Sequence, residues 1–227
     1  MEEESIFEVL KLNSAIKLKQ FIKNNPDCLE ETYDDYDDRN AIHFSNAEQT
    51  EILIKAGLSP YSPDKEGVPG ALSPIVFSTE ELEKIENESV NSIFFLSEET
   101  SFDFAENFIN KLKVCIKCGF DINFEFSEGK NALFYSIYPE VIPFLIEQGC
   151  DINKKDDYGK NALHYIDNPR QIKALLANGI EILDIPHRSE KIEKIIQDVK
   201  IERIKNEKEN LSEIFRESLN KKLTNRL

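Results

Sequence analysis

The sequence predicts an all-α fold in which pairs of short helices, joined by short turn or hairpin tips, stack into a solenoid. The first observation is a repeat, because residues 129–153 realign without a gap onto residues 159–183 at a shift of 30. The second is the helical spacing of apolar residues within each unit, as in residues 142–146. The third is the glycine that closes each unit, Gly149 and Gly179, since glycine readily takes the left-handed conformation that ends a helix.

Each unit contains the signals for a turn and two helices. A turn with Asp and Gly at residues 156–159 leads to Asn161, whose side-chain oxygen can cap the short apolar helix that follows. A proline, Pro139 or Pro169, then interrupts the chain before the second helix. The same frame recurs at residues 119–123, and at residues 40–44 followed by Gly57.

These units resemble ankyrin repeats. Residues 161–165 (NALHY) are similar to the TPLHxA helix start of that family, and residues 145–153 (LIEQGCDIN) are similar to its LLxxGADVN end. The resemblance covers about residues 5–186 and is clearest over residues 114–183. The units are three residues shorter than the usual 33, and the loss falls between the two helices. The resemblance implies an ankyrin-repeat solenoid that holds other proteins through its turn tips and the inner face of its first helices.

The sequence divides into three regions and carries one insertion. The regions are N-terminal capping helices at 1–33, ankyrin-like repeats at 34–186 and a C-terminal helical extension at 187–227. Ser5 is placed to cap the first helix. The second repeat is lengthened by an acidic insertion at about residues 73–107, because its closing glycine, Gly119, lies 62 residues after Gly57.

The insertion and the extension each carry apolar residues. In the insertion, residues 93–96 together with Phe102, Phe104 and Phe108 predict that part of this segment folds onto the array. The glutamates that would then face outward are Glu80, Glu81, Glu83, Glu98 and Glu99. In the extension, apolar stripes at residues 192–199 and 211–219 predict two helices or one bent helix. The first stripe suits a helix that covers the open end of the array, and the second leaves open a role in partner binding or oligomerisation.

The net charge excludes two classes of partner. Forty-three Asp and Glu against 28 Lys and Arg give −15, so nucleic acid and anionic membranes would repel the protein. Residues 27–38 hold seven acids and no base, and residues 78–107 hold nine acids against Lys84 alone. The N-terminus has no basic region, and no apolar run reaches the roughly 18 residues of a membrane span. We therefore expect a cytoplasmic protein whose four cysteines are reduced.

No residue pattern predicts catalysis, a cofactor or a metal. Cys115 and Cys118 form a CxxC pair, but Cys115 aligns with the buried leucine of the second helix, and no second pair of ligands follows at metal-binding spacing. His43 and His164 occupy the histidine of the TPLH-like motif, which in the ankyrin family braces the turn, and Phe134 replaces it in the third repeat. We therefore predict that the chain is not an enzyme.

The predicted site is a protein-binding surface made of turn tips and insertion. At the tips it consists of Tyr33, Asp34, Asp35, Tyr36, Asp37, Asp38 and Arg39 in the first repeat, Lys65 and Glu66 in the second, Glu128 and Lys130 in the third, and Asp157, Tyr158 and Lys160 in the fourth. Tyr138, near the end of an inner helix, and the five outward glutamates complete it. Tyr and Arg are residue types that anchor interfaces, and carboxylates can pair with Lys or Arg of a partner.

The short NALFY and NALHY units are also similar to those of small bacterial ankyrin proteins that act as immunity proteins. This resemblance implies a protein that binds and neutralises a basic bacterial toxin or effector, with an acidic surface that steers their association. We expect the free protein to be a monomer. The alternatives are an ankyrin scaffold or host-directed effector, and an enzyme. A toxin-like reading frame directly upstream would favour the immunity protein, whereas loss of an activity on mutating His164 or Cys118 would favour the enzyme.

Overall fold

The protein is mostly helical. The structure is a computed structural model that describes residues 5–33, 38–65, 67–73, 98–136, 138–183 and 189–224, with the side chains of 98–103 and 217–224 left out. The α-helices are α1 (Ile6–Lys11), α2 (Ala15–Asn24), α3 (Ala41–Phe44), α4 (Ala47–Ala56), α6 (Glu98–Lys117), α7 (Val141–Glu147), α8 (Pro169–Ala177) and α9 (Glu190–Thr224). Short 3-10 helices are η1 (Pro26–Glu30), η2 (Gly70–Leu72), η4 (Ser127–Gly129), η5 (Ala132–Tyr135) and η6 (Ala162–His164). Strands β1 (Thr32–Tyr33) and β2 (Arg39–Asn40) pair antiparallel.

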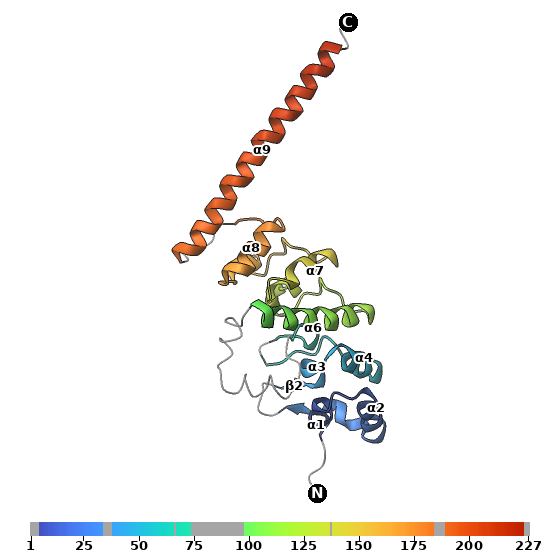
Figure 1. Ribbon diagram of the computed structural model, residues 1–227. Helices are drawn as coiled ribbons and strands as arrows, with labels where there is room; N and C mark the ends of the chain where they lie inside the picture. The colour runs from blue at the N-terminus through green and yellow to red at the C-terminus, as the bar shows by residue number, and fades with distance from the viewer. Residues whose placement is uncertain are drawn as a thin grey trace.

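The helices lie in two rows that follow the order of the chain. Figure 1 shows α2, α4, α6, α7 and α8 one after another along the molecule, and each contacts the next. On the other side α1 contacts α3, and α3 contacts η2. Beyond α8, α9 leads away from the far end as one straight helix rather than two. Each helix therefore buries its apolar side mainly against its neighbours along the chain.

Local sequence sets the helix boundaries. Ser5 accepts a hydrogen bond from the Glu8 N–H at 3.4 Å through its side chain, so α1 begins where the sequence predicts. The predicted short helix after Asn161 is one 3-10 turn, η6, and α8 starts at Pro169. The residue before a proline avoids the α conformation, so the chain must leave the helical path between them. Gly149 and Gly179 close α7 and α8 with φ of 88° and 91°, as predicted.

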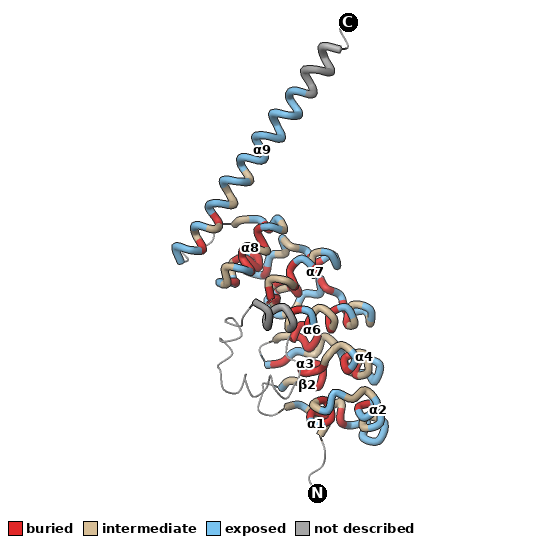
Figure 2. Tube along the Cα trace, in the orientation of Figure 1, coloured by how far each residue is buried: buried red, intermediate tan, exposed pale blue. Residues whose placement is uncertain are grey.

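The apolar core forms two clusters, one from α1 to α4 and one from η2 to the start of α9, and partly buried Ile54 packs against both. Figure 2 shows buried residues in every layer from α1 to the start of α9. Cys115, Leu145 and Leu175 occupy equivalent positions in their helices and are 0%, 1% and 0% exposed. Burial raises the pKa of the Cys115 thiol to about 11, so it is a packing residue rather than a reactive thiolate.

A buried donor recurs eight residues before the closing glycine of three units. Gln49 donates its side-chain amide to the Leu10 carbonyl at 2.8 Å, and Gln171 donates to the Ser136 carbonyl at 2.7 Å. Lys111, in the same position of α6, donates to the Ile42 carbonyl at 2.6 Å. In each case the second helix of one unit is bonded to the first helix of the unit before it, or to the residue that directly follows that helix.

Lys111 makes a second contact that its counterparts lack. Its ammonium also donates to the carbonyl of Ser73, at 3.1 Å, the last described residue before α6. The side chain is fully buried, and this burial lowers the pKa of its amine to about 7. Lys111, a residue type that is normally exposed, is therefore part of the core. Its hydrogen bonds connect α6 both to the first unit and to Ser73.

A second set of hydrogen bonds links successive units at the ends of the outer helices. Asn123 donates to the Gly149 carbonyl at 2.8 Å and accepts from the Asp151 N–H at 2.8 Å. One unit earlier, the Tyr61 hydroxyl takes both roles, donating to Gly119 at 3.3 Å and accepting from Asp121 at 2.7 Å. One unit later, Asn153 accepts from the Glu181 N–H at 2.8 Å. Residues at equivalent sequence positions therefore make equivalent hydrogen bonds to the next unit.

The last ten residues of the predicted insertion, 98–107, are helical. Since α6 begins at Glu98, residues 98–107 extend the outer helix of the second unit toward its N-terminus. Ala105 on this extension and Phe108 directly after it are 1% and 2% exposed and belong to the main apolar cluster, so this part packs onto the neighbouring helices as expected. The expectation for residues 93–96 lies outside the described residues, and so does the one for the Phe102 side chain.

The start of α9 covers the end of the array. Ile192 and Ile196 are 4% and 7% exposed and join the main core. Arg203 donates to the carbonyls of Leu176 and Ile180 at 2.7 and 2.9 Å, which satisfies backbone groups at the end of α8. These contacts agree with the covering role expected for the first apolar stripe.

Candidate protein-binding surface

Three turn tips share one backbone hydrogen bond. In each tip the N–H of the first residue donates to the carbonyl of the residue four positions later. The donors are Asp64 (3.0 Å), Phe126 (2.8 Å) and Asp156 (2.8 Å). The carboxylate of Asp64 also accepts from the Val68 N–H, and that of Asp156 from the Lys160 N–H, both at 2.9 Å. The tips are therefore loops closed by hydrogen bonds at equivalent sequence positions.

The tips of the third and fourth units meet in one surface. The Asp157 N–H donates to the Glu128 carbonyl at 3.0 Å, and the Tyr158 hydroxyl donates to the Glu128 carboxylate at 3.4 Å. Glu128 also pairs with Lys130, and this hydrogen bond lowers the pKa of the Glu128 carboxyl. We call Glu128, Lys130, Tyr158, Lys160 and Tyr165 the third–fourth tip surface.

Aromatic rings and ammonium groups are stacked across this surface. Lys130 and Lys160 lie 4.8 and 5.7 Å from the centre of the Tyr165 ring, in cation–π range. Tyr158 and Tyr165 are 65% and 41% exposed, so their rings remain available to a partner. Partial burial raises the pKa of Tyr165 to about 12, helped by its hydrogen bond to the Asp156 carboxylate. Sequence reasoning missed Tyr165, although Tyr135 marks the same position in the preceding unit.

The first and second tips are joined by ion pairs. The Arg39 guanidinium lies 3.1 Å from the carboxylate of Asp64, whose side chain is only 1% exposed. Lys65 reaches Asp38 at 3.9 Å with both side chains in solvent, a weak pair in free-energy terms. Arg39 therefore holds two tips together, while Asp38 and Lys65 stay accessible.

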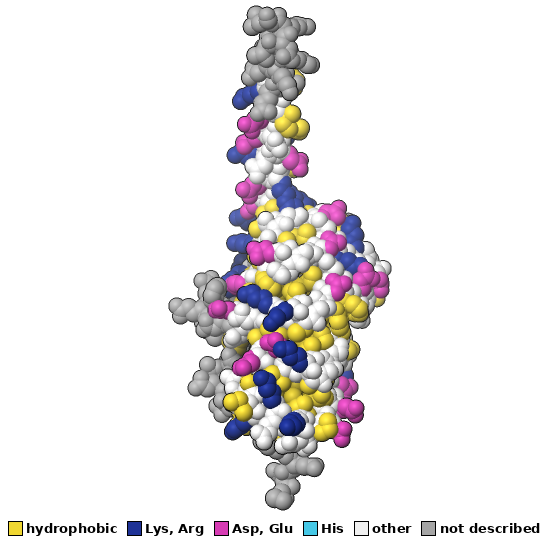
Figure 3. Space-filling view, turned by 90° about the vertical axis from the view of Figure 1, so that its right-hand side faces the viewer, with side chains coloured by type: hydrophobic (Ala, Val, Ile, Leu, Met, Phe, Trp, Pro, Cys, Tyr) yellow, Lys and Arg dark blue, Asp and Glu magenta, His cyan; other side chains and the backbone are white. Residues whose placement is uncertain are grey.

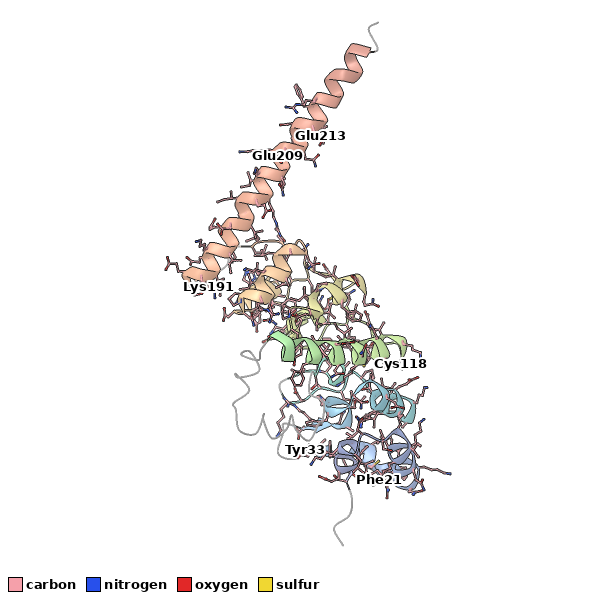
Figure 4. The ribbon with its side chains drawn as sticks, viewed as in Figure 1. Phe21, Tyr33, Cys118, Lys191, Glu209 and Glu213 are labelled. Carbon is pink, nitrogen blue, oxygen red and sulfur yellow. The ribbon has the colours of Figure 1, made fainter. Side chains whose placement is uncertain are left out.

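Two predicted contact residues do not lie on this surface. Tyr138 is 5% exposed, and its ring centre lies 6.4 Å from that of Phe108 in α6. Tyr33, the last residue of β1 and labelled in Figure 4, is half-buried, with its ring 5.0 Å from Phe7 and 5.4 Å from Phe44. The exposure expected for Tyr138 is thus wrong, and both rings serve packing in this conformation.

Most of the predicted acidic residues lie outside the described part of the chain. These are Asp34, Asp35 and Asp37 of the first tip, Glu66 of the second, Glu80, Glu81 and Glu83 of the insertion, and the side chains of Glu98 and Glu99; Tyr36 of the first tip also lies outside it. The described tips carry both charges in similar measure. Figure 3 likewise shows acidic, basic and hydrophobic side chains interspersed over one face of the body. The acidic excess therefore belongs mainly to the segments at 34–37 and 78–103.

An exposed aromatic group beside the tips was also missed. Phe124 is 45% exposed, and its ring lies 4.7 Å from Tyr61 and 5.0 Å from Phe126. Lys154 holds the equivalent position in the next unit, so the repeat itself gave no signal for an aromatic residue here.

The two histidines brace their turns. The His43 Nδ1 accepts from the Asn40 N–H at 3.2 Å, which leaves Nε2–H to donate to the Val68 carbonyl at 3.2 Å. Burial lowers the pKa of His43 to about 4, so its ring is neutral at pH 7. His164 accepts from the Asn161 N–H in the same way, at 3.2 Å. Within the described residues no three His, Cys, Asp or Glu side chains gather as metal ligands.

Comparisons with known proteins add no family or relative. No family model matches the chain, and a search of curated proteins finds no match. Among the described helices, none combines the length and the apolar character that crossing a bilayer requires.

The contact between the third and fourth tips can be tested with two glycines of matched backbone. Gly129 and Gly159 have φ of 72° and 74°, so alanine at either is strained by about 1–2 kcal/mol. A Cβ on Gly129 would lie 2.6 Å from the Asp157 carboxylate, whereas one on Gly159 meets nothing within 4 Å. Urea unfolding should therefore show a larger loss for Gly129→Ala than for Gly159→Ala, by about 1 kcal/mol. Equal losses would mean that the two tips are not coupled.

Proposed function

We propose that this chain is a non-enzymatic, protein-binding scaffold built as a solenoid of short ankyrin-type repeats. Support comes from the recurrence of three kinds of contact at equivalent sequence positions: the buried donors, the hydrogen bonds of Tyr61, Asn123 and Asn153, and the tip backbones. A repeated sequence that makes the same contacts in each unit is what a solenoid requires. The mostly helical architecture is compatible with this fold.

The observation that carries the binding proposal is the third–fourth tip surface. Tyr158 and Tyr165 are exposed, yet rigid loops and neighbouring ammonium groups hold them in place. Aromatic side chains that are already ordered lose little conformational entropy on binding, and Tyr is enriched among residues that dominate interface energies. The described residues hold no comparable constellation for catalysis: Cys115 is buried, and both histidines are engaged by their own turns.

We further propose that the partner is a basic bacterial toxin or effector and that the chain is its cytoplasmic immunity protein. Support comes from the sequence, in which the excess acid is concentrated at residues 27–38 and 78–107. Such a surface speeds the encounter with a basic partner and selects against acidic ones. Binding alone would suffice to neutralise the toxin.

The test is a pull-down from the native organism followed by binding measurements with the recovered partner. Changing Asp34, Asp35, Asp37 and Asp38 together to Asn should weaken binding about tenfold or more at low ionic strength, and added salt should shrink the difference. The control removes the same number of charges from α9, at Glu190, Glu202, Glu209 and Glu213, and should change binding little. Indifference to salt and to the Asp variants would contradict the electrostatic mechanism.

A second candidate, an ankyrin scaffold that binds a partner of no particular charge, is favoured by the mixed charges of the described tips. In that case Tyr158→Ala should weaken binding strongly while the Asp variants do not. Ile16→Ala, a change at another exposed apolar residue, serves as its control. If neither Tyr158→Ala nor the Asp variants alter affinity, the tips are not the contact surface.

A further inference from the structure

The outer part of α9 carries an apolar stripe that nothing in the described structure covers. The stripe consists of Ile201, Ile204, Leu211 and Phe215, which are 64%, 53%, 66% and 65% exposed. Every residue from 204 to 216 is exposed. Figure 4 shows this part of α9, with Glu209 and Glu213 labelled, well away from the body. Half of the exposed large hydrophobic residues of the described chain are on this one helix.

The stripe is on a different side of α9 from the side that docks on the body. Successive residues of a helix turn by about 100°, so Ile201 and Arg203 point to nearly opposite sides. Arg203 is bonded to the end of α8, and Ile192 and Ile196 share its side. The docking of α9 on the array therefore leaves the stripe free along its whole length. An isolated helix with an uncovered apolar side gains no packing energy, so this arrangement favours a partner.

The pattern of the stripe is that of a coiled-coil seam. Ile204, Lys208, Leu211 and Phe215 are spaced by four, three and four residues, the alternation of a and d positions in a heptad. The stripe is narrow, and charged residues flank it. Residues 201–216 hold four Lys or Arg and four Glu, so this stretch is neutral. Helices that bind anionic membranes carry a Lys- and Arg-rich polar face instead.

The distribution of charge also favours a second copy of this chain as the partner that covers the stripe. Residues 1–189 carry a net charge of −17, whereas residues 190–227 carry +2. Two bodies repel each other, but two α9 helices do not, so the helix is the part of the molecule through which copies can approach. We propose that α9 pairs with α9 of a second copy in an antiparallel two-helix coiled coil, in place of the monomer expected from sequence.

Two features favour the antiparallel direction. In a parallel pair in register, Lys208 would face Lys208 of the other copy within an apolar seam, which is unfavourable. Reversing the spacing of four, three and four gives the same spacing, so an antiparallel pair sets Ile204 against Phe215 and Lys208 against Leu211 of the other copy. This direction also holds the two acidic bodies at opposite ends of the paired helices.

The mass in solution tests the pairing. Sedimentation equilibrium of the full chain should give about twice 26.2 kDa, and Leu211→Glu and Phe215→Glu should each give 26.2 kDa. Ile16→Glu, at a residue of α2 that is 79% exposed, is the matched control and should remain dimeric. Glutamate is a good helix former and the sites are exposed, so the thermal midpoint of the body should not change. A monomeric wild-type chain, or Glu variants that remain dimeric, would overturn the proposal.

Spin labels test the direction. Lys194, which is exposed, can be changed to Cys in a Cys118→Ser background and labelled. In the antiparallel pair the two labels are offset by 31 residues, about 46 Å along the axis at 1.5 Å per residue. In a parallel pair there is no axial offset, and the distance should be below about 30 Å. A single short distance would overturn the antiparallel arrangement.

Discussion

Replacing Lys111 with alanine should destabilise the protein by about 4 kcal/mol. The side chain is fully buried, so its removal leaves a cavity beneath α6. The carbonyl of Ser73 also loses the donor that lies 3.1 Å away. The carbonyl of Ile42 is less affected, because it still accepts from the N–H and the hydroxyl of Ser45 at 3.3 and 3.1 Å. The free energy of unfolding in urea, at pH 7, measures the effect.

Lys111→Met separates packing from hydrogen bonding. Methionine fills most of the space of the lysine stem and removes the cost of burying an amine, so we expect a loss within about 1 kcal/mol at pH 7. Because the folded-state pKa of Lys111 is lowered to about 7, the unfolded chain binds this proton more readily between pH 7 and 10.5. Wild type should therefore gain stability relative to Lys111→Met as the pH rises from 7 to 9. If the methionine variant is as unstable as the alanine variant, the loss of stability comes from the missing hydrogen bonds rather than from the cavity.

Acid should destabilise the protein through His43. Its pKa is about 4 in the folded chain against 6.5 for the ordinary side chain, because burial disfavours the charged ring. Between these values the unfolded chain binds more protons, so stability falls as the pH drops from 6.5 toward 4. The contribution of this group reaches about 3 kcal/mol once the pH is below 4.

The control variant is His43→Phe, because the third unit has phenylalanine at this position. Phe134 stands at the equivalent position, so His43→Phe should still fold while losing the bond to Val68. Other groups titrate alike in both proteins. Between pH 7.5 and 4.5 we therefore expect wild type to lose about 2–3 kcal/mol more than His43→Phe. An equal loss in the two proteins would mean that His43 is not held neutral by the fold.

The sequence predicted features that depend on local chemistry. Ser5 as a cap, Gly149 and Gly179 as helix ends, and the burial of Cys115 each follow from a residue type at a position in a repeat. The mostly helical class followed from the same periodicity.

Lys111 and Tyr138 were missed because their burial depends on another segment. A lysine in an amphipathic helix normally keeps its ammonium in water, and only its alignment with Gln49 and Gln171 hints at an inward donor. Tyr138 is 5% exposed and its ring lies 6.4 Å from that of Phe108 in α6, and the repeat could not indicate the N-terminal extension of this helix because no other unit has it. The single helix α9 was ambiguous because a polar run separates its two stripes.

The hydrogen bonds of Gln171 and Lys111 also indicate how the chain accommodates the long segment between Ser73 and α6. Gln171 and its acceptor are 35 residues apart in sequence, while Lys111 and Ile42 are 69 apart. The entropy lost in closing a loop grows only with the logarithm of its length, so doubling it costs about 0.6 kcal/mol. The loss expected for Lys111→Ala is several times that amount. Added length between Ser73 and α6 is therefore thermodynamically cheap, which makes this junction a natural place to graft a foreign peptide.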